Sequence, residues 1–152
     1  MTVIKYLGKW SLMATFFFFS LQSCSIQLIS QYDDITDKSV TVLQEKVMKN
    51  LVKLERYVGT PEADYDKYKA FYDEAKVDLS SLKIRADAID KNTIVQQQIV
   101  ELTKMMGNME ALHKLGFTRT DDIKALEIPF NSAFTAIVKL QLALKRGDKK
   151  QS

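Results

Sequence analysis

After residue 31, apolar side chains recur at steps of three and four residues along most of the chain. This is the spacing of one face of an amphipathic helix. The pattern divides into four stretches, over about 32–57, 61–88, 93–115 and 118–146, with short breaks between them. No stretch shows the apolar–polar alternation of a β-strand. We therefore predict an all-α fold, an up-down antiparallel four-helix bundle over residues 32–146.

The apolar stripe of each stretch predicts which side chains face the core. The stripe of the second stretch is the most regular, because its steps of three and four alternate without a fault. The predicted inward residues are Thr36, Val40, Leu43, Val47, Leu51, Leu54 and Val58; Tyr65, Tyr68, Tyr72, Ala75, Leu79, Leu82, Ala86 and Ile89; Val95, Ile99, Leu102, Met106, Met109 and Leu112; and Ile123, Leu126, Phe130, Phe134, Ile137, Leu140 or Gln141, and Leu144.

Glycine and proline are scarce and mark the ends of these stretches. Thr60 is a suitable N-cap and Pro61 a suitable first residue for a second helix that begins at position 61. Gly116 is a suitable stop for the third helix. Pro129 lies inside the fourth stretch, so we expect a kink there, or a short helix over 120–127 followed by a longer one.

The first 24 residues follow another pattern. Lys5 and Lys9 precede a mainly apolar run over residues 11–21. That run has the length of the apolar region of a signal peptide and is too short to span a bilayer. Leu21, Ser23 and Cys24 come directly after it, and this arrangement resembles the bacterial lipobox.

The lipobox resemblance implies a precise fate for the N-terminus. Residues 1–23 would be a signal peptide that is removed, with Leu21 and Ser23 recognised at the cleavage site, while Gln22 departs mildly from the usual small residue. Cys24 would carry a thioether-linked diacylglycerol and usually a third acyl chain on its amine. Two or more chains hold a protein stably at a membrane, whereas one holds it marginally. Residues 24–31 would be a lipidated tether.

At the other end of the chain, the polar composition of residues 147–152 predicts a disordered tail, independently of the lipobox.

The same resemblance predicts a location in the cell envelope. In a Gram-negative organism the absence of Asp after Cys24 favours the periplasmic leaflet of the outer membrane, and in a Gram-positive one the outer face of the plasma membrane remains. Removing residues 1–23 lowers the formal net charge from +3 to +1, because Lys5 and Lys9 leave with them. That charge gives no support for nucleic-acid binding. No cysteine then remains for a disulfide.

The sequence contains few candidates for catalytic residues. Glu110 and His113 have the Glu-x-x-His spacing of di-iron bundles, but such sites need two of these motifs and further glutamates, and His113 is the one histidine of the chain. We interpret the motif as a coincidence, with His113 partly exposed near a helix end. We predict no enzymatic activity, no metal site, and no cofactor other than the lipid on Cys24.

Two groups of residues have both a structural and a functional interpretation. Asp33, Asp34 and Asp37 suit the positive end of the first helix, or form a weak patch for a divalent cation or a partner. An aromatic group in the second stretch suits the core, with hydroxyls that reach its rim, or forms a contact surface for a partner. Its members are Tyr65, Tyr68, Phe71 and Tyr72.

The chain behind residue 24 also resembles small, uncharacterised bacterial helical lipoproteins. The shared features are a Tyr-Asp-x-x-Thr-Asp opening at 32–37, a Leu-Gln at 43–44 and a Phe-Asn-x-Ala-Phe-Thr-Ala-Ile segment at 130–137. The resemblance implies a lipoprotein and brings no activity. Our hypothesis is a membrane-anchored, non-enzymatic structural or protein-interaction module with an envelope protein as partner. The alternative is a lipoprotein that binds a small ligand or a metal in the bundle core or at the acidic start of the first helix.

Overall fold

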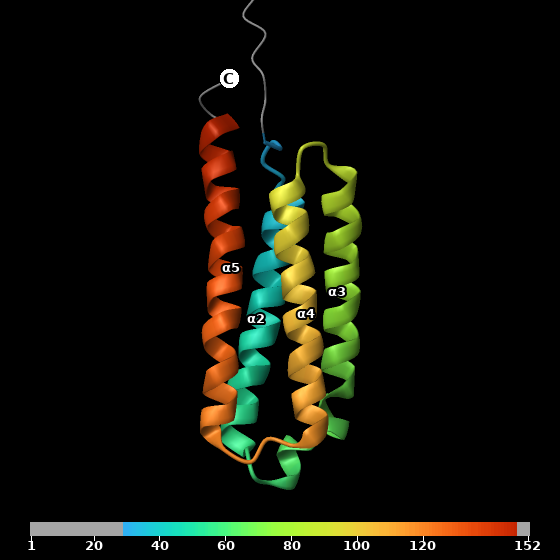
Figure 1. Ribbon diagram of the computed structural model, residues 1–152, viewed down its shortest axis with the longest axis vertical. Coiled ribbons are helices and arrows are strands. Elements are labelled where there is room, and N and C mark those ends of the chain that lie inside the picture. Colours follow the sequence, from blue (N-terminus) through green and yellow to red (C-terminus); the bar gives the residue numbers. More distant parts are fainter. Residues whose placement is uncertain (1–28, 149–152) are drawn as a thin grey trace, which may run out of the picture.

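The computed structural model describes residues 29–148 and is all-α over that range. The predicted signal peptide with Leu21 and Ser23, the predicted lipidation site Cys24, and residues 149–152 lie outside the described residues. Four α-helices form a bundle, α2 (Asp34–Tyr57), α3 (Lys69–Ala88), α4 (Thr93–Leu115) and α5 (Thr120–Asp148), with two short 3-10 helices, η1 (Pro61–Ala63) and η2 (Tyr65–Tyr68), before α3 (Figure 1). No helix among residues 29–148 has the length and apolar character needed to cross a bilayer.

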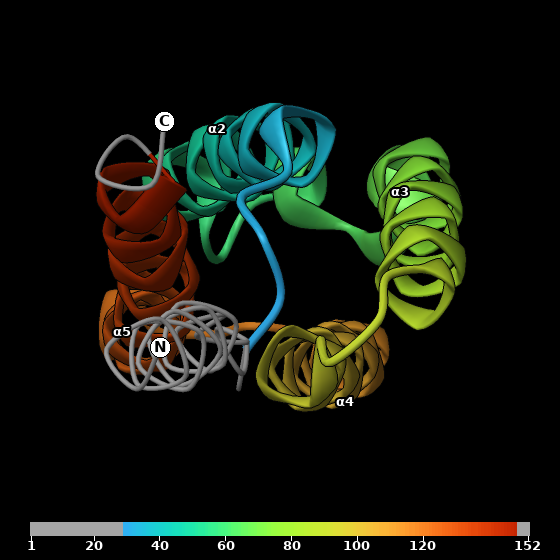
Figure 2. The ribbon, with the colours of Figure 1, turned by 90° about the horizontal axis from the view of Figure 1, so that it is seen from above.

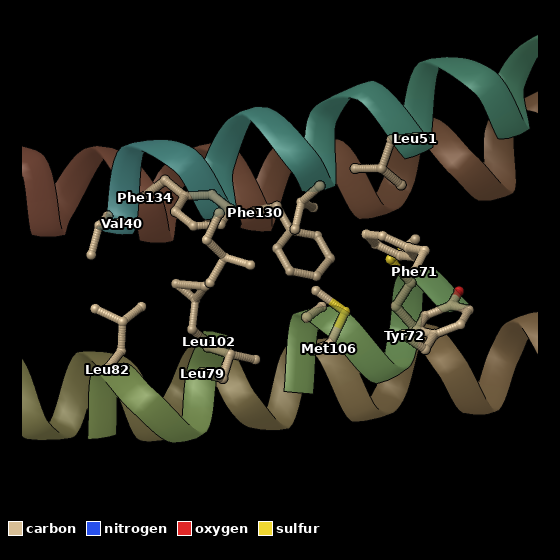
Figure 3. Packing of buried hydrophobic residues seen from close by; sticks show 14 of the residues in the cluster. Val40, Leu51, Phe71, Tyr72, Leu79, Leu82, Leu102, Met106, Phe130 and Phe134 are labelled. Atoms are coloured by element: carbon tan, nitrogen blue, oxygen red, sulfur yellow. The ribbon is translucent and has the colours of Figure 1, made fainter. Parts of the chain in front are cut away.

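The helices surround one continuous core. Going round the bundle, α2 contacts α3, α3 contacts α4, α4 contacts α5 and α5 returns to α2 (Figure 2). Each helix places its apolar stripe toward the centre, where Leu51, Leu102 and Phe134 are each at most 1% exposed (Figure 3). Burying such side chains contributes about 1.5–3 kcal/mol each to folding. The bundle predicted from the hydrophobic spacing is confirmed at this level.

A few predicted inward positions differ from the structure. Leu112 is 46% exposed, because Met109 and His113 occupy the inward positions of that turn. Of the pair at 140 and 141, Gln141 is the buried residue, at 2% exposure. Four others at the rim of the stripes are only partly buried, namely Val58, Tyr65, Ile89 and Leu126.

The second helix does not begin at Pro61 as predicted. Asp64 has an extended backbone, with ψ 138°, and this conformation separates η1 from η2 so that the α-helix starts at Lys69. The side chain of Thr60 caps no helix and instead donates to the carbonyl oxygen of Tyr57 at 2.7 Å. The irregular segment turns Ala63 into the core and directs its carbonyl oxygen at α4.

The fourth helix is continuous through Pro129, so the predicted division at residue 127 is wrong. Proline removes one backbone hydrogen bond and crowds the preceding turn, at a cost of about 3 kcal/mol in a helix interior. Here the buried residues Ile123 and Phe130 lie on either side of that turn and hold both halves in the same core. Packing therefore outweighs the local preference of proline.

We expect Pro129→Ala to stabilise the protein by about 1–2 kcal/mol, since the helix regains a hydrogen bond while the unfolded chain gains some freedom. Urea unfolding of both proteins measures the difference. Pro129→Gly is the matched control and is expected to gain about 1 kcal/mol less than the alanine variant. A loss of stability in Pro129→Ala would show that the proline fits its site.

Candidate functional site

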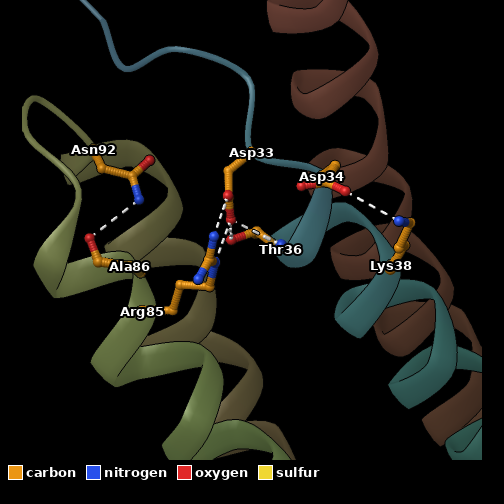
Figure 4. Close-up of polar contacts among 7 residues, drawn as sticks. All are labelled: Asp33, Asp34, Thr36, Lys38, Arg85, Ala86 and Asn92. Atoms are coloured by element: carbon orange, nitrogen blue, oxygen red, sulfur yellow. Dashed lines mark hydrogen bonds and ion pairs between the residues drawn. The ribbon is translucent and has the colours of Figure 1, made fainter.

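The segment before α2 is fastened across one end of the bundle, which we call the tether end. The Ser30 backbone N–H donates to the carbonyl oxygen of Lys91 at 3.1 Å, and its hydroxyl donates to Oδ1 of Asn92 at 3.0 Å. Nδ2 of Asn92 in turn donates to the carbonyl oxygen of Ala86 at 3.1 Å (Figure 4). Ser30 and Asn92 are both buried. These bonds fix the start of the described chain to the connection between α3 and α4.

Tyr32 fastens the same segment to the last turns of α5. Its backbone N–H donates to Oδ2 of Asp148 at 3.0 Å, and Nζ of Lys145 lies 5.0 Å from its ring centroid. Its hydroxyl donates to Oδ2 of Asp37 at 2.8 Å. Through Ser30 and Tyr32, the segment therefore contacts the connection before α4, the last turn of α5 and the first turn of α2.

Asp33 joins the start of α2 to the end of α3. It is the N-cap of α2, and its Oδ2 accepts the backbone N–H of Thr36 at 2.9 Å. Arg85 approaches the same carboxylate with two nitrogens, Nε at 2.6 Å from Oδ2 and Nη2 at 2.5 Å from Oδ1 (Figure 4). The hydrogen bonds from Arg85, followed by those from Thr36, hold the pKa of Asp33 well below its usual range. Paired bonds of this kind fix orientation as well as charge.

The three aspartates considered as a cation or partner patch are each engaged with a different group. Asp33 binds Arg85, Asp34 forms an ion pair with Lys38 at 3.0 Å, and Asp37 accepts the hydroxyl of Tyr32. Within residues 29–148, no three His, Cys, Asp or Glu side chains are grouped so as to hold a metal ion. The helix-capping interpretation is confirmed for Asp33.

His113 is buried at the opposite end, and the prediction of a partly exposed side chain is wrong. Its exposure is 1%. Nε2 lies 2.7 Å from the carbonyl oxygen of Ala63, and Nδ1 lies 2.9 Å from the hydroxyl of Tyr72. Because a carbonyl oxygen only accepts, we assign the hydrogen to Nε2, and Nδ1 then accepts from Tyr72. Burial lowers the pKa of His113 and favours this neutral form.

Glu110 belongs to a separate charged group on the rim. Its carboxylate binds Nζ of Lys76 at 2.8 Å, Nζ of Lys114 at 3.1 Å and the hydroxyl of Tyr65 at 2.8 Å. These contacts, with that from Lys76 the largest, lower its pKa to about 2. Glu110 and His113 therefore serve different networks, in keeping with a coincidental Glu-x-x-His spacing.

The aromatic group lies mainly inside the protein. Tyr68, Phe71 and Tyr72 are 1%, 8% and 0% exposed, so they are core residues and do not offer a contact surface. Tyr65 is partly exposed and lies beneath Nζ of Lys114, 5.0 Å from its ring centroid. Of the four residues predicted as a partner contact, Tyr65 is the one that keeps an accessible face.

The apolar surface that the sequence analysis missed lies between α2 and α3. A groove of about 760 Å³ opens there, in the half of these helices nearest the tether end, and we call it the α2–α3 groove. Ile35, Val42 and Ile84 line it and are 48%, 58% and 69% exposed. These residues stand outside the inward stripes, and apolar positions that a helical stripe does not explain are the signal that would have found them.

We expect the stability of the protein to fall as the pH drops from 7.5 to 5. The unfolded chain binds a proton at the ordinary histidine pKa near 6.5, whereas the folded chain resists protonation of buried His113. The stabilisation that comes from neutral, buried His113 is therefore complete above about pH 6.5 and is lost progressively as the pH falls below it. Urea unfolding across this range is expected to show the slope in the natural protein and a flat profile in His113→Gln. The same slope in both proteins would contradict the assignment.

The comparisons with known proteins supply no relative from which a role can be taken. No protein-family model, curated protein or solved structure matches this chain. The function is therefore argued from the N-terminal pattern and from the geometry of the tether end and the α2–α3 groove.

Proposed function

We propose that this chain is a lipid-anchored protein of the bacterial cell envelope whose up-down antiparallel bundle is a non-enzymatic protein-interaction module. In a Gram-negative organism we place it at the periplasmic leaflet of the outer membrane. The lipobox resemblance at Cys24 supports the anchor. The fastening of residues 30–33 supports a bundle that is displayed from one end and held rigidly there.

The α2–α3 groove is the observation that supports an interaction role. It brings together three exposed branched apolar side chains from two neighbouring helices, Ile35 and Val42 of α2 and Ile84 of α3. Exposed apolar patches with polar surroundings are typical of protein contact sites. Lys38, Asp78 and Arg85 border the groove and supply such surroundings. A helix of an envelope protein, with apolar side chains at steps of three and four residues, fits this surface.

The chemistry of the described residues supports a non-enzymatic role. The imidazole of His113 is enclosed and bonded on both nitrogens, so it has no access to a substrate. The carboxylates of Asp33 and Glu110 are held as anions by cationic partners. Groups with strongly shifted pKa values are often catalytic, but in these two cases the shift arises from ion pairs that connect helices.

The anchor is tested by the intact mass and detergent-phase partitioning of the natural protein and of Cys24→Ala. The natural protein is expected in the detergent phase with the mass of residues 24–152 plus acyl chains. Cys24→Ala is expected to lack the lipid mass. A natural protein that retains residues 1–23, or that carries a bare thiol at Cys24, would contradict the proposal.

The interaction role is tested by placing a photo-cross-linking amino acid at position 84 in intact cells. Position 128 is the matched control, because Ile128 is 71% exposed on α5, whereas Ile84 is 69% exposed on α3. We expect one discrete protein adduct from position 84, identified by mass spectrometry, and its loss when Val42→Asp is added. Equal adducts from both positions would contradict a specific contact.

The groove also supports the alternative of a small apolar ligand. This alternative is tested by measuring the melting temperature of the protein with and without long-chain fatty acids, and with and without divalent cations. A rise with a fatty acid that Val42→Asp removes would favour ligand binding in the groove. A rise with a divalent cation that is lost in an Asp33→Ala, Asp37→Ala double variant would favour the acidic start of α2.

A further inference from the structure

We propose that the tether end rests on the bilayer, with Ile29 and Ile94 at the level of the lipid headgroups and neighbouring cations on anionic lipids. The inference rests on the proposed anchoring at Cys24. It adds which surface of the bundle meets the membrane and which end points away from it.

The place where the chain leaves the bundle is fixed by the contacts described above. Ser30 is bonded to Lys91 and Asn92, so Ile29 is held beside the connection between α3 and α4. Figure 2 shows the segment crossing the end of the bundle from α2 toward α4. Ile29, Lys91 and Ile94 line one small hollow together with Leu140 and Leu144. The described part of the chain therefore begins at the corner between α4 and α5.

The reach of the chain limits the distance between this corner and the membrane. Residues 24 and 29 are five positions apart. A polypeptide spans at most about 3.6 Å per residue, so Ile29 lies within about 18 Å of a lipid-bearing Cys24. A helix of the length of α5, at 1.5 Å per residue, extends about 43 Å. The end that contains His113 is therefore beyond the reach of the tether when the bundle stands upright.

The chemistry of the corner suits a bilayer surface. Ile29 and Ile94 are 46% and 49% exposed and line the same small hollow. Lys91 borders them, and the last turn of α5 adds Lys145 and Arg146. Apolar side chains flanked by cations are the composition of interfacial contacts, and each cation near an anionic surface strengthens the attraction to it.

The acidic groups of the same corner do not cancel this arrangement. Asp148 accepts the backbone N–H of Tyr32 and so faces the tether segment. Asp90 lies in the connection beside Lys91. With Asp37 on the hydroxyl of Tyr32, the corner carries three cations, Lys91, Lys145 and Arg146, and three anions. The preference for anionic over zwitterionic lipid therefore rests on the position of the cations around Ile29 and Ile94, and not on an excess of charge.

The test uses the full, lipidated protein in vesicles that contain anionic lipid. Cys24 is the one cysteine of the sequence and is acylated in the proposal, so Ile94→Cys and Leu115→Cys each accept a single fluorophore. Leu115 is 84% exposed at the end of α4 opposite Ile94. Quenchers attached to the lipid headgroups are expected to reduce the signal at position 94 about threefold more than at position 115, because α4 separates the two sites by roughly 30 Å.

The outcomes separate this proposal from the anchoring on which it rests. Failure of the protein to float with the vesicles overturns both. Flotation with equal quenching at positions 94 and 115 overturns the orientation and leaves the anchor standing. A label at Ile128→Cys on α5 that is quenched as strongly as the label at position 94 would show a bundle lying on its side, and it also overturns the proposal. Exchange of anionic for zwitterionic lipid is expected to weaken the quenching at position 94, and no change would overturn the role of the cations.

Discussion

Replacing Tyr72 with alanine is expected to destabilise the protein by about 3–5 kcal/mol, the cost of removing a large buried aromatic side chain. Tyr72 is 0% exposed and packs against Phe71, with ring centroids 4.9 Å apart. Its hydroxyl also donates to Nδ1 of His113. The variant therefore creates a cavity and leaves a buried acceptor without a donor. Urea unfolding at pH 7.5 measures the change in the free energy of unfolding.

Tyr72→Phe separates the two contributions. It keeps the ring and removes the hydroxyl, so the expected loss is about 1–3 kcal/mol, the cost of an unsatisfied buried polar group. Combining it with His113→Gln gives a double-variant cycle. The loss of stability in the double variant is expected to be smaller than the sum of the losses in the two single variants, because both substitutions remove the same bond. Full additivity, or a Tyr72→Phe variant as stable as the natural protein, would contradict the hydrogen bond.

The helices were predictable because their signal is local and repeated. Leu79, Leu82 and Ala86 are buried where steps of three and four residues placed them. Such a stripe depends only on the 3.6-residue period and on the need to bury one face of each helix. The start and end of α4 agree with the sequence for the same reason, since Gly116 ends the helix with φ 92°.

The errors arise where distant partners decide the local structure. His113 is buried because Ala63 and Tyr72, 50 and 41 positions away, satisfy both of its nitrogens. Arg85 is 52 positions from Asp33, so sequence spacing gives no sign of their pairing. The continuity of α5 through Pro129 depends on core contacts from neighbouring helices, which outweigh a local preference that the sequence does show.

The candidate surfaces were less predictable than the core. Tyr65 and Tyr72 occupy equivalent positions in the stripe, yet Tyr65 is partly exposed and Tyr72 is enclosed. The extended Asp64 places Tyr65 at the start of the 3-10 helix η2, outside the α-helix that carries Tyr72. The α2–α3 groove is formed by exposed residues of two helices that are separated by a long connection. Its recognition requires the pairing of those helices, which a helical period does not specify.

Asp33→Ala is expected to lower the free energy of unfolding by about 1–3 kcal/mol, an effect second to that of Tyr72→Ala. The loss of an N-cap costs about 0.5–2 kcal/mol. The side chain of Arg85, which is partly exposed, loses its partner as well and adds a smaller amount that solvent screening reduces. Asp33→Asn isolates the ion pair, because asparagine caps helices as well as aspartate does.

The pH dependence of the Asp33→Ala effect follows from the direction of the pKa shift. Arg85 and Thr36 lower the pKa of Asp33 in the folded state, so its stabilisation is complete above the unfolded value near 3.9 and is lost as the pH falls below it. The difference in the free energy of unfolding between the natural protein and Asp33→Ala is therefore expected to be largest at pH 6–7 and to decrease below pH 4. Asp34→Ala is the control, because Asp34 forms an exposed pair with Lys38 that solvent screens, so its removal is expected to change stability much less. A gap that stays constant down to pH 2, or an equal loss in Asp34→Ala, would contradict the charged bridge between α2 and α3.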